Sequence, residues 1–258
     1  MTVTSAPVSR DDLSKPLHAG DFPETRIPRS WGMTGIDAAL FDLINRKWAS
    51  PFLDRVLPLF SSLDAWKPVI LATALLLLVF GKSKGRALLL CLAVGLLLGD
   101  VLVSSHLKRL VNRPRPREVH AGTLERSLPP VNPAILGVFA APVVKEAKVA
   151  AGPAKSGRSF PSSHVINVFM LATAAFQFHR FAGTILAMGG LLVAWSRVYC
   201  GSHWPGDLPV SVVLGILVGW ISCRIASAIL RRFGWTGGGG IATLSPGTRR
   251  PPDSHPNR

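Results

Sequence analysis

The sequence is poor in charged residues and in cysteine. Charged side chains make up 17% of its 258 residues, well below the quarter that is usual in soluble domains. The three cysteines are odd in number and lie in or beside apolar stretches, which excludes a disulfide scaffold. Residues 1–28 contain no long apolar run, so we expect no signal peptide there. The charge that is present is unbalanced, with 29 basic and 14 acidic side chains.

Charge is scarcest in the second half of the chain, where apolar runs dominate. The 63 residues 161–223 contain only three formal charges: Arg180, Arg197 and Asp207. The chain has five apolar runs: Trp66–Phe80, Ala87–Leu107, Val165–Phe178, Phe181–Trp195 and Leu208–Cys223. A helix needs about 20 residues to cross a bilayer, so the shorter runs must use flanking residues as well. Five such runs favour an all-α polytopic membrane bundle of about five transmembrane helices over the buried helices of a soluble protein.

Composition divides the rest of the chain. We expect a disordered polar N-terminus over residues 1–30 and a disordered tail, rich in Gly, Pro and Arg, over residues 231–258. Residues 31–65 carry apolar side chains at helical spacing, which predicts amphipathic helices that lie at the membrane interface or pack against the bundle. Residues 66–230 then form the membrane domain.

An extramembrane loop, residues 108–160, interrupts the apolar runs. It carries three glutamates and ten basic residues: Lys108, Arg109, Arg113, Arg115, Arg117, Arg126, Lys145, Lys148, Lys155 and Arg158. A solvated loop beside anionic headgroups is one interpretation. Nucleic acid is disfavoured as a partner because the neighbouring helices place this loop at a membrane.

Three polar segments border the apolar runs, and they cover residues 108–116, 159–164 and 196–207. If the runs are sequential helices, the second and fourth end on the membrane face where the third and fifth begin. The three segments are therefore expected to meet at one face of the membrane.

The side chains in these segments suit phosphate chemistry. The cations Lys108, Arg115 and Arg197 match phosphate oxygens. A histidine oriented by a carboxylate can act as nucleophile or base, and a second histidine can protonate a leaving oxygen. The segments hold no cluster of cysteine or carboxylate ligands, so we predict no metal and no cofactor. Metal-free phosphoryl transfer fits best.

The fixed positions of these segments form one ordered pattern: Lys108-x6-Arg115-Pro116, Pro161-Ser162-Ser163-His164 and Ser196-Arg197-x5-His203-x3-Asp207. This pattern resembles the type 2 phosphatidic acid phosphatase superfamily, which includes bacterial lipid phosphatases and vanadium haloperoxidases. The resemblance covers about residues 87–230. The spacing Phe41…Asn45…Asp54 also resembles the beginning of short bacterial undecaprenyl-diphosphate phosphatases.

The resemblance implies a role for each matching residue. His203 would be the nucleophile that forms a phosphohistidine, and Asp207 would hold its imidazole. His164 would protonate the leaving group and then activate water. The remaining residues would bind the phosphoryl oxygens: Lys108, Arg115, Ser162, the backbone N–H of Ser163, and Arg197. Many family members have Gly where this chain has Ser163, a change that keeps the amide donor.

Structural interpretations of single residues stay open from the sequence alone. Asp207 could cap the last helix, and Arg197 could extend toward lipid headgroups. His164 and His203 could each serve only as hydrogen-bonding groups. Asp100 is an ionisable residue inside an apolar run and therefore a functional suspect, but it matches no motif position.

Together these features predict an integral-membrane lipid phosphatase. The expected partners are the bilayer and a lipid phosphate: undecaprenyl diphosphate first, then phosphatidate, phosphatidylglycerophosphate or lipid A. The alternatives are an inactive protein that binds anionic lipids and a vanadate-dependent haloperoxidase-like enzyme. The basic short loops and the resemblance place the protein in a bacterial inner or plasma membrane, with its site facing the periplasm or cell exterior.

Overall fold

The computed structural model describes residues 35–149 and 158–234. The N-terminus predicted to be disordered, and residues 235–258 of the predicted tail, lie outside these ranges. The helical elements are α2 (Gly35–Asp42), η2 (Leu43–Lys47), α3 (Pro51–Ser61), α4 (Leu63–Phe80), α5 (Lys82–Leu96), η3 (Leu97–Ser104), α6 (Ser105–Val111), α7 (Pro116–Val119), η4 (Ala134–Phe139), α8 (Ser163–Phe178), α9 (Arg180–Tyr199) and α10 (Asp207–Arg232). The strands are β1 (Leu124–Ser127) and β2 (Val143–Glu146).

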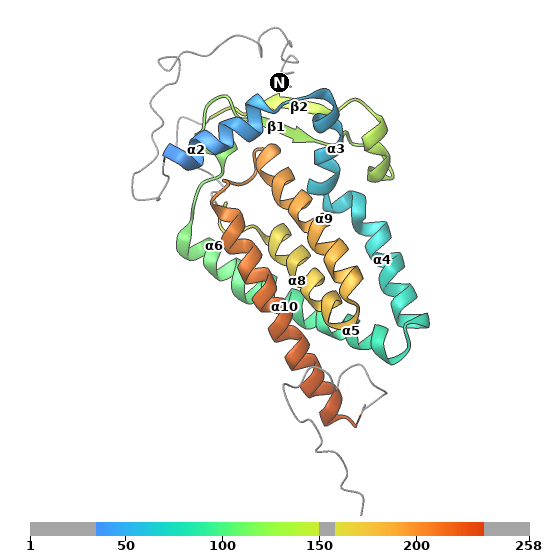
Figure 1. The fold of residues 1–258 in the computed structure, drawn as a ribbon. Coiled ribbons are helices and arrows are strands. Elements are labelled where there is room, and N and C mark those ends of the chain that lie inside the picture. The colour runs from blue at the N-terminus through green and yellow to red at the C-terminus, as the bar shows by residue number, and fades with distance from the viewer. Residues whose placement is uncertain (1–34, 150–157, 235–258) are drawn as a thin grey trace, which may run out of the picture.

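The predicted all-α membrane bundle is confirmed. Within the described ranges, four helical segments are long and apolar enough to cross a membrane: α4, α9, α10 and the segment Lys82–Val119, which contains α5, η3 and α6. The shorter apolar helix α8 has 16 residues and packs against α5, α9 and α10 (Figure 1).

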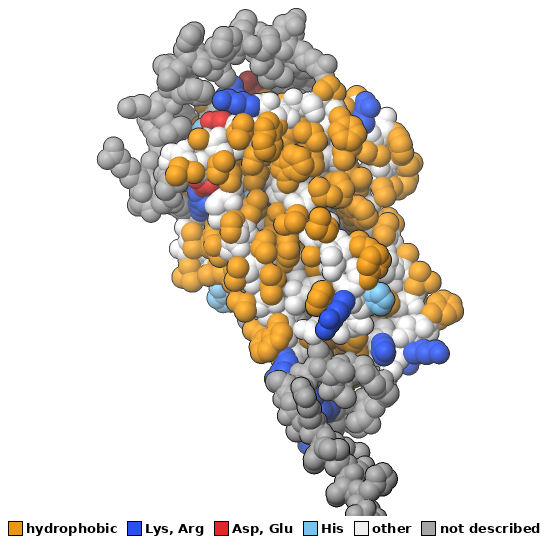
Figure 2. All heavy atoms as spheres, in the orientation of Figure 1, with side chains coloured by type: hydrophobic (Ala, Val, Ile, Leu, Met, Phe, Trp, Pro, Cys, Tyr) orange, Lys and Arg blue, Asp and Glu red, His pale blue; other side chains and the backbone are white. Residues whose placement is uncertain are grey.

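Apolar side chains cover the outside of this bundle. Figure 2 shows them along its sides, with basic side chains gathered toward the end where α10 finishes. On α4, Leu71 is 69% exposed and Phe80 is 73% exposed. An apolar surface of this extent is stable in lipid and not in water, so the chain is an integral membrane protein.

Helices α8 and α10 approach each other closely through glycine. A Cβ atom at Gly215 would lie 2.7 Å from the carbonyl oxygen of Ile166, and one at Gly219 would lie 2.8 Å from that of Met170. Small residues four positions apart allow this contact between backbones in a membrane, where packing rather than the hydrophobic effect holds helices together. The contact fixes the beginnings of α8 and α10, which carry site residues, relative to each other.

The predicted extramembrane loop contains an antiparallel hairpin. Strands β1 and β2 pair with Leu124 opposite Glu146 and Ser127 opposite Val143. This hairpin lies at the same end of the bundle as α2 and α3, and we call these elements together the cap (Figure 1).

The N-terminal part of the cap packs on the bundle. Phe41 is fully buried against Val198 and Trp204. The same segment keeps Ile36 and Phe52 on its outer surface, where they are 70% and 71% exposed. Residues 35–61 therefore contact the bundle and also present apolar side chains on their outer surface.

Asn45 and Asp54 join the cap to α9. The Asn45 amide donates to the carbonyl oxygens of Leu124 (2.9 Å) and Tyr199 (2.8 Å), and its oxygen accepts the Leu124 N–H. Asp54 pairs with Arg126 at 2.5 Å, and Arg126 donates to the Tyr199 carbonyl at 2.8 Å. Asn45 and Asp54, two positions of the Phe41…Asn45…Asp54 spacing, therefore have a structural role.

Candidate active site

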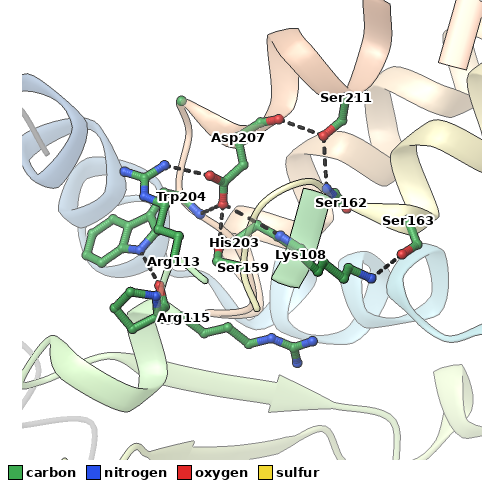
Figure 3. A network of polar contacts seen from close by, with 12 residues as sticks. Lys108, Arg113, Arg115, Ser159, Ser162, Ser163, His203, Trp204, Asp207 and Ser211 are labelled. Atoms are coloured by element: carbon green, nitrogen blue, oxygen red, sulfur yellow. Dashed lines mark hydrogen bonds and ion pairs between the residues drawn. The ribbon is translucent and has the colours of Figure 1, made fainter. Parts of the chain in front are cut away.

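The three polar segments meet at the cap end of the bundle, as their topology predicts (Figure 3). Lys108 lies near the end of α6, and Arg115 immediately precedes α7. Ser163 and His164 begin α8, and Arg197 lies in the last turn of α9. The following turn carries His203, and α10 begins at Asp207.

Local backbone features direct these segments toward one another. Helix α6 ends at Asn112, whose φ of 46° is left-handed, and the chain then leaves the helix toward Arg115 and Pro116. The turn after α9 contains Gly201 at φ 71°, where a Cβ atom would lie 2.8 Å from the side chain of Thr123. Glycine is required at this point because the turn approaches the hairpin closely.

His203 and Asp207 form a buried pair. The side chain of His203 is 3% exposed and that of Asp207 is not exposed. Nδ1 of His203 lies 3.6 Å from Oδ2 of Asp207. This distance is beyond that of a hydrogen bond but within the range of a strong electrostatic interaction. The same Oδ2 accepts the Trp204 N–H at 3.0 Å and the hydroxyl of Ser159.

Burial keeps the imidazole of His203 neutral. The pKa of His203 is lowered from 6.5 to about 4, chiefly by burial and also by the positive charge of Arg197, although Asp207 acts to raise it. A buried cation is costly, so the group loses its proton at a pH where an exposed histidine keeps it. At neutral pH, His203 is therefore uncharged and has a free lone pair.

We expect an NMR titration of the His203 ring to have its midpoint near pH 4, with the ring neutral above that pH and charged below it. In Asp207→Asn the midpoint should move to lower pH, because the negative charge of Asp207 raises the pKa of His203. The measurement follows histidine ring carbons in detergent micelles, with the His203 signal assigned by its loss in His203→Ala. A midpoint near 6.5 would contradict this description.

The predicted phosphate-binding cations are withdrawn from water to different extents: Arg197 is buried, and Lys108 and Arg115 are partly buried. Lys108 donates through Nζ to the hydroxyl of Ser163. Arg197 is 9% exposed, and its Nη1 donates to the carbonyl oxygen and hydroxyl of Ser61, at 3.2 and 2.5 Å. The charges of Arg115 and Arg197 act on Lys108, so positive charge accumulates at this end of the bundle.

Several buried polar atoms of the site have no hydrogen-bond partner among the described residues. They are Nε of Arg115, Oγ of Ser162, Nε of Arg197 and Nδ1 of His203. Buried polar groups are nearly always paired in folded proteins, and each unpaired group is costly. A bound anion would satisfy the cationic donors and offset their mutual repulsion.

The serines at the beginning of α8 have distinct partners. The backbone N–H of Ser162 donates to the hydroxyl of Ser211 at 2.9 Å, and that hydroxyl donates to the carbonyl of Asp207 at 2.6 Å. Ser163 shares its hydroxyl with Lys108 and with Ser104, at 2.7 Å from the latter. The backbone N–H of Ser162 therefore joins α8 to α10, whereas the Ser162 hydroxyl, which has no partner in the described part of the chain, can bind a ligand.

The sequence interpretation missed Arg113, which it counted only as one of the basic residues of the loop. Nη1 of Arg113 donates to Oδ1 of Asp207 at 2.5 Å. Its position two residues before Arg115 was the available signal, but Arg113 and Arg115 look alike in the sequence. Ser159 was within a recognised segment, yet its contact with Asp207 was not predicted.

Asp100, the ionisable suspect inside an apolar run, and His120 each have a polar partner other than His203 and Asp207. The Asn167 amide donates to Oδ2 of Asp100 at 3.0 Å, so Asp100 has a polar partner within the bundle. His120 pairs with Asp42 at 2.9 Å in the cap. Over residues 35–149 and 158–234, no group of three or more His, Cys, Asp or Glu side chains could hold a metal ion.

Comparison with known proteins gives several sequence matches. YbjG from Escherichia coli (strain K12), named as a candidate undecaprenyl-diphosphatase, is 40% identical over 77 residues, which are 30% of this chain and 37% of that relative. The lipid A 4'-phosphatase of Bacteroides thetaiotaomicron is 26% identical over 186 residues, which are 71% of this chain and 74% of the relative. The chain thus spans just over a third of the first relative and about three quarters of the second.

The fold has a known counterpart among solved structures. The crystal structure of Aquifex aeolicus LpxE matches with a TM-score of 0.50 and 24% sequence identity, over 74% of this chain and 96% of that chain. The family model of the PAP2 superfamily matches residues 85–231, a range that holds every site residue predicted from the motifs. The chain therefore belongs to the PAP2 superfamily.

Proposed function

We propose that this protein is a membrane lipid phosphatase that hydrolyses a lipid phosphate or diphosphate through a phosphohistidine. The observation that carries the proposal is the neutral, buried His203 beside Asp207, together with the buried Nε atoms of Arg115 and Arg197, which have no hydrogen-bond partner among the described residues. Phosphoryl transfer needs little beyond a positioned nucleophile and positive charge around the phosphoryl oxygens. The names of the relatives, undecaprenyl-diphosphatase and lipid A 4'-phosphatase, support the same class of reaction.

In the first step, Nε2 of His203 attacks phosphorus, because Nδ1 lies on the Asp207 side of the ring. A P–N bond forms as the bond between phosphorus and the leaving oxygen breaks. The ring becomes positively charged, and the Asp207 carboxylate stabilises that charge. Lys108, Arg115 and Arg197 stabilise the negative charge on the phosphoryl oxygens in the transition state.

His164 serves both halves of the reaction. It gives its proton to the leaving oxygen in the first step and takes a proton from water in the second, when water attacks phosphorus and the P–N bond breaks. The positive charges of Arg197, Lys108 and Arg115 act on His164 before substrate binds. A bound phosphate offsets this positive charge, so substrate binding itself favours the protonated form of His164.

Undecaprenyl diphosphate is our first choice of substrate, followed by phosphatidate, phosphatidylglycerophosphate and lipid A phosphates. The site lies at the end of an apolar bundle, so a lipid headgroup can reach it while the tail stays in the bilayer. The cations bind the phosphate, which all of these lipids share. The first two relatives named above support a diphosphate or a lipid A phosphate.

We further propose that the site faces the periplasm or cell exterior of a bacterial inner or plasma membrane. The short turns and helix ends away from the cap carry basic residues: Lys82, Lys84, Arg86, Arg180, Arg231 and Arg232. Basic short loops favour the cytoplasmic side, which places the cap and the site on the other side.

Purified protein in detergent should release phosphate from at least one lipid of a panel that contains these four substrate types. The activity should persist in EDTA, because the proposed steps use only side chains. Activity that is lost in EDTA and restored only by Mg²⁺ or Zn²⁺ would contradict the mechanism. Binding of these lipids without any phosphate release would identify the chain as a lipid-binding protein instead.

A further inference from the structure

The carboxylate of Asp207 is connected to the N-terminal helix α2 through a single arginine. Arg113 Nη1 donates to Oδ1 of Asp207 at 2.5 Å, and its Nη2 donates to Oδ2 of Asp37, also at 2.5 Å. The other oxygen of Asp37 accepts the N–H of Gly206 at 2.7 Å. Asp37 therefore holds both Arg113 and the turn between His203 and Asp207.

These three charged side chains are shielded from water. The side chains of Asp37, Arg113 and Asp207 are 10%, 9% and 0% exposed. Two carboxylates and one guanidinium carry a net charge of −1 when all are ionised. Charges interact strongly at such a buried position, so the charge of Asp37 influences Asp207 through Arg113.

Arg113 also determines which oxygen of Asp207 faces the imidazole. The guanidinium occupies Oδ1 and leaves Oδ2 toward His203 (Figure 3). Arg113 itself is held firmly, since its guanidinium lies 5.6 Å from the ring centroid of Trp204 and its carbonyl accepts the Ser159 N–H at 2.7 Å. The orientation of Asp207 thus depends on contacts from α2, the segment after α6 and the segment before α8.

We propose that Asp37 and Arg113 are positioning residues for His203, and that Asp37 maintains the negative charge that Asp207 presents to the imidazole. The proposal rests on the proposed function, because it concerns the phosphorylation of His203. Asp37 lies outside residues 85–231, the range that the family model matches. The assignment makes helix α2, which carries Asp37, a part of this active site.

The expected effect follows from the charge that develops during phosphorylation. The ring of His203 becomes positive as the P–N bond forms, the bond to the leaving oxygen breaks, and the proton of His164 moves to that oxygen. Asp37→Asn keeps the shape of the side chain but removes its negative charge. The positive charge of Arg113 is then neutralised by Asp207 alone, which weakens the negative charge that Asp207 presents to the imidazole. The positive ring is then less stabilised, whereas the three phosphate-binding cations are untouched. The phosphorylation rate should fall about 10- to 100-fold, with KM changed less than about 3-fold.

The test compares Asp37→Asn with a matched control, Asp54→Asn, in the purified full chain. Asp54 also pairs with a buried arginine in the cap, Arg126 at 2.5 Å, but it is not among the partners of Asp207 or His203. Thermal stability, KM, and the rate of phosphohistidine formation are measured for both variants. Both should lose stability, and only Asp37→Asn should lose phosphorylation rate. Arg113→Lys, which keeps one charge but cannot hold both carboxylates in a fork, should show the same selective loss.

Equal phosphorylation rates in the two Asp variants, or an effect of Asp37→Asn confined to KM, would overturn the proposal. If Asp37→Asn does not fold, Arg113→Lys is judged by the same criteria against Asp54→Asn. If the wild-type chain releases phosphate but Asp37→Asn and Arg113→Lys show no selective loss of phosphorylation rate, only this inference is overturned. A wild-type chain that is inactive on every lipid overturns the proposed function and this inference together.

Discussion

His203→Ala should reduce phosphate release to the background rate for every lipid substrate. The substitution removes the nitrogen that attacks phosphorus, and none of the neighbouring side chains can replace it. Removing a covalent nucleophile typically lowers kcat by about 10⁴-fold or more, because the reaction loses its two-step route. Phosphate release from 32P-labelled lipid measures the loss.

The covalent intermediate gives a second measurement of the same variant. Wild-type protein that is quenched after a brief reaction should carry label that is labile in acid and stable in alkali, as a phosphohistidine is, and His203→Ala should carry none. Vanadate, which can adopt the five-coordinate geometry of phosphorus in the transition state, should compete with substrate. His106→Ala is a suitable control because His106 is exposed on α6 and lies outside the site. Label that survives in His203→Ala would assign the nucleophile to another residue.

The membrane bundle was predictable because its signal is continuous along the sequence. Charged residues, Gly or Pro separate consecutive apolar runs, and the long helices of the structure begin and end near these separations. The meeting of the three polar segments was also predictable. When helices cross a membrane one after another, the second and fourth end on the same face, and the third and fifth begin there. These inferences need only length, polarity and order, and no knowledge of side-chain contacts.

The hairpin was not predictable because its sequence carries no regular local pattern. Strand β1 has the sequence Leu-Glu-Arg-Ser, four residues that show no regular apolar alternation. Its place is set by contacts that are distant in sequence, such as the two bonds between Asn45 and the Leu124 backbone. A local pattern therefore indicated a loop, and tertiary contacts determined its form.

The charge network behind Asp207 was equally hidden in the sequence. Arg113 and Arg115 stand in the repeat Arg-Pro-Arg-Pro, yet the guanidinium of Arg113 pairs with two buried carboxylates, whereas Arg115 immediately precedes α7 and is one of the predicted phosphate-binding cations. Asp37 is 169 residues from Gly206, to which it bonds. A single sequence contains no information that joins such positions, so only the fold could bring the N-terminal helix to the site.

His164→Ala should separate the two steps of the reaction according to the leaving group. A lipid alkoxide is a poor leaving group and needs the proton of His164, so its phosphorylation step should slow by about 100- to 10,000-fold. A nitrophenolate leaves without protonation, so phosphorylation by a nitrophenyl phosphate should be largely spared. Dephosphorylation still needs His164 to activate water. The variant should therefore release one burst of nitrophenol and then stop as the phosphorylated protein.

The decisive measurement is the single-turnover rate of the first step for both substrates, with folding of the variant in detergent verified. A rate that falls much more for the lipid than for the nitrophenyl ester supports proton donation by His164, since an altered phosphate site would slow both substrates alike. Asp207→Asn is the matched comparison, because loss of its charge weakens the attack by His203 on either substrate. Its two rates should fall by similar factors, with Lys108 and Arg115 still binding phosphate. Equal losses for both substrates in His164→Ala would remove the acid from the mechanism and leave His164 as a structural neighbour of the cations.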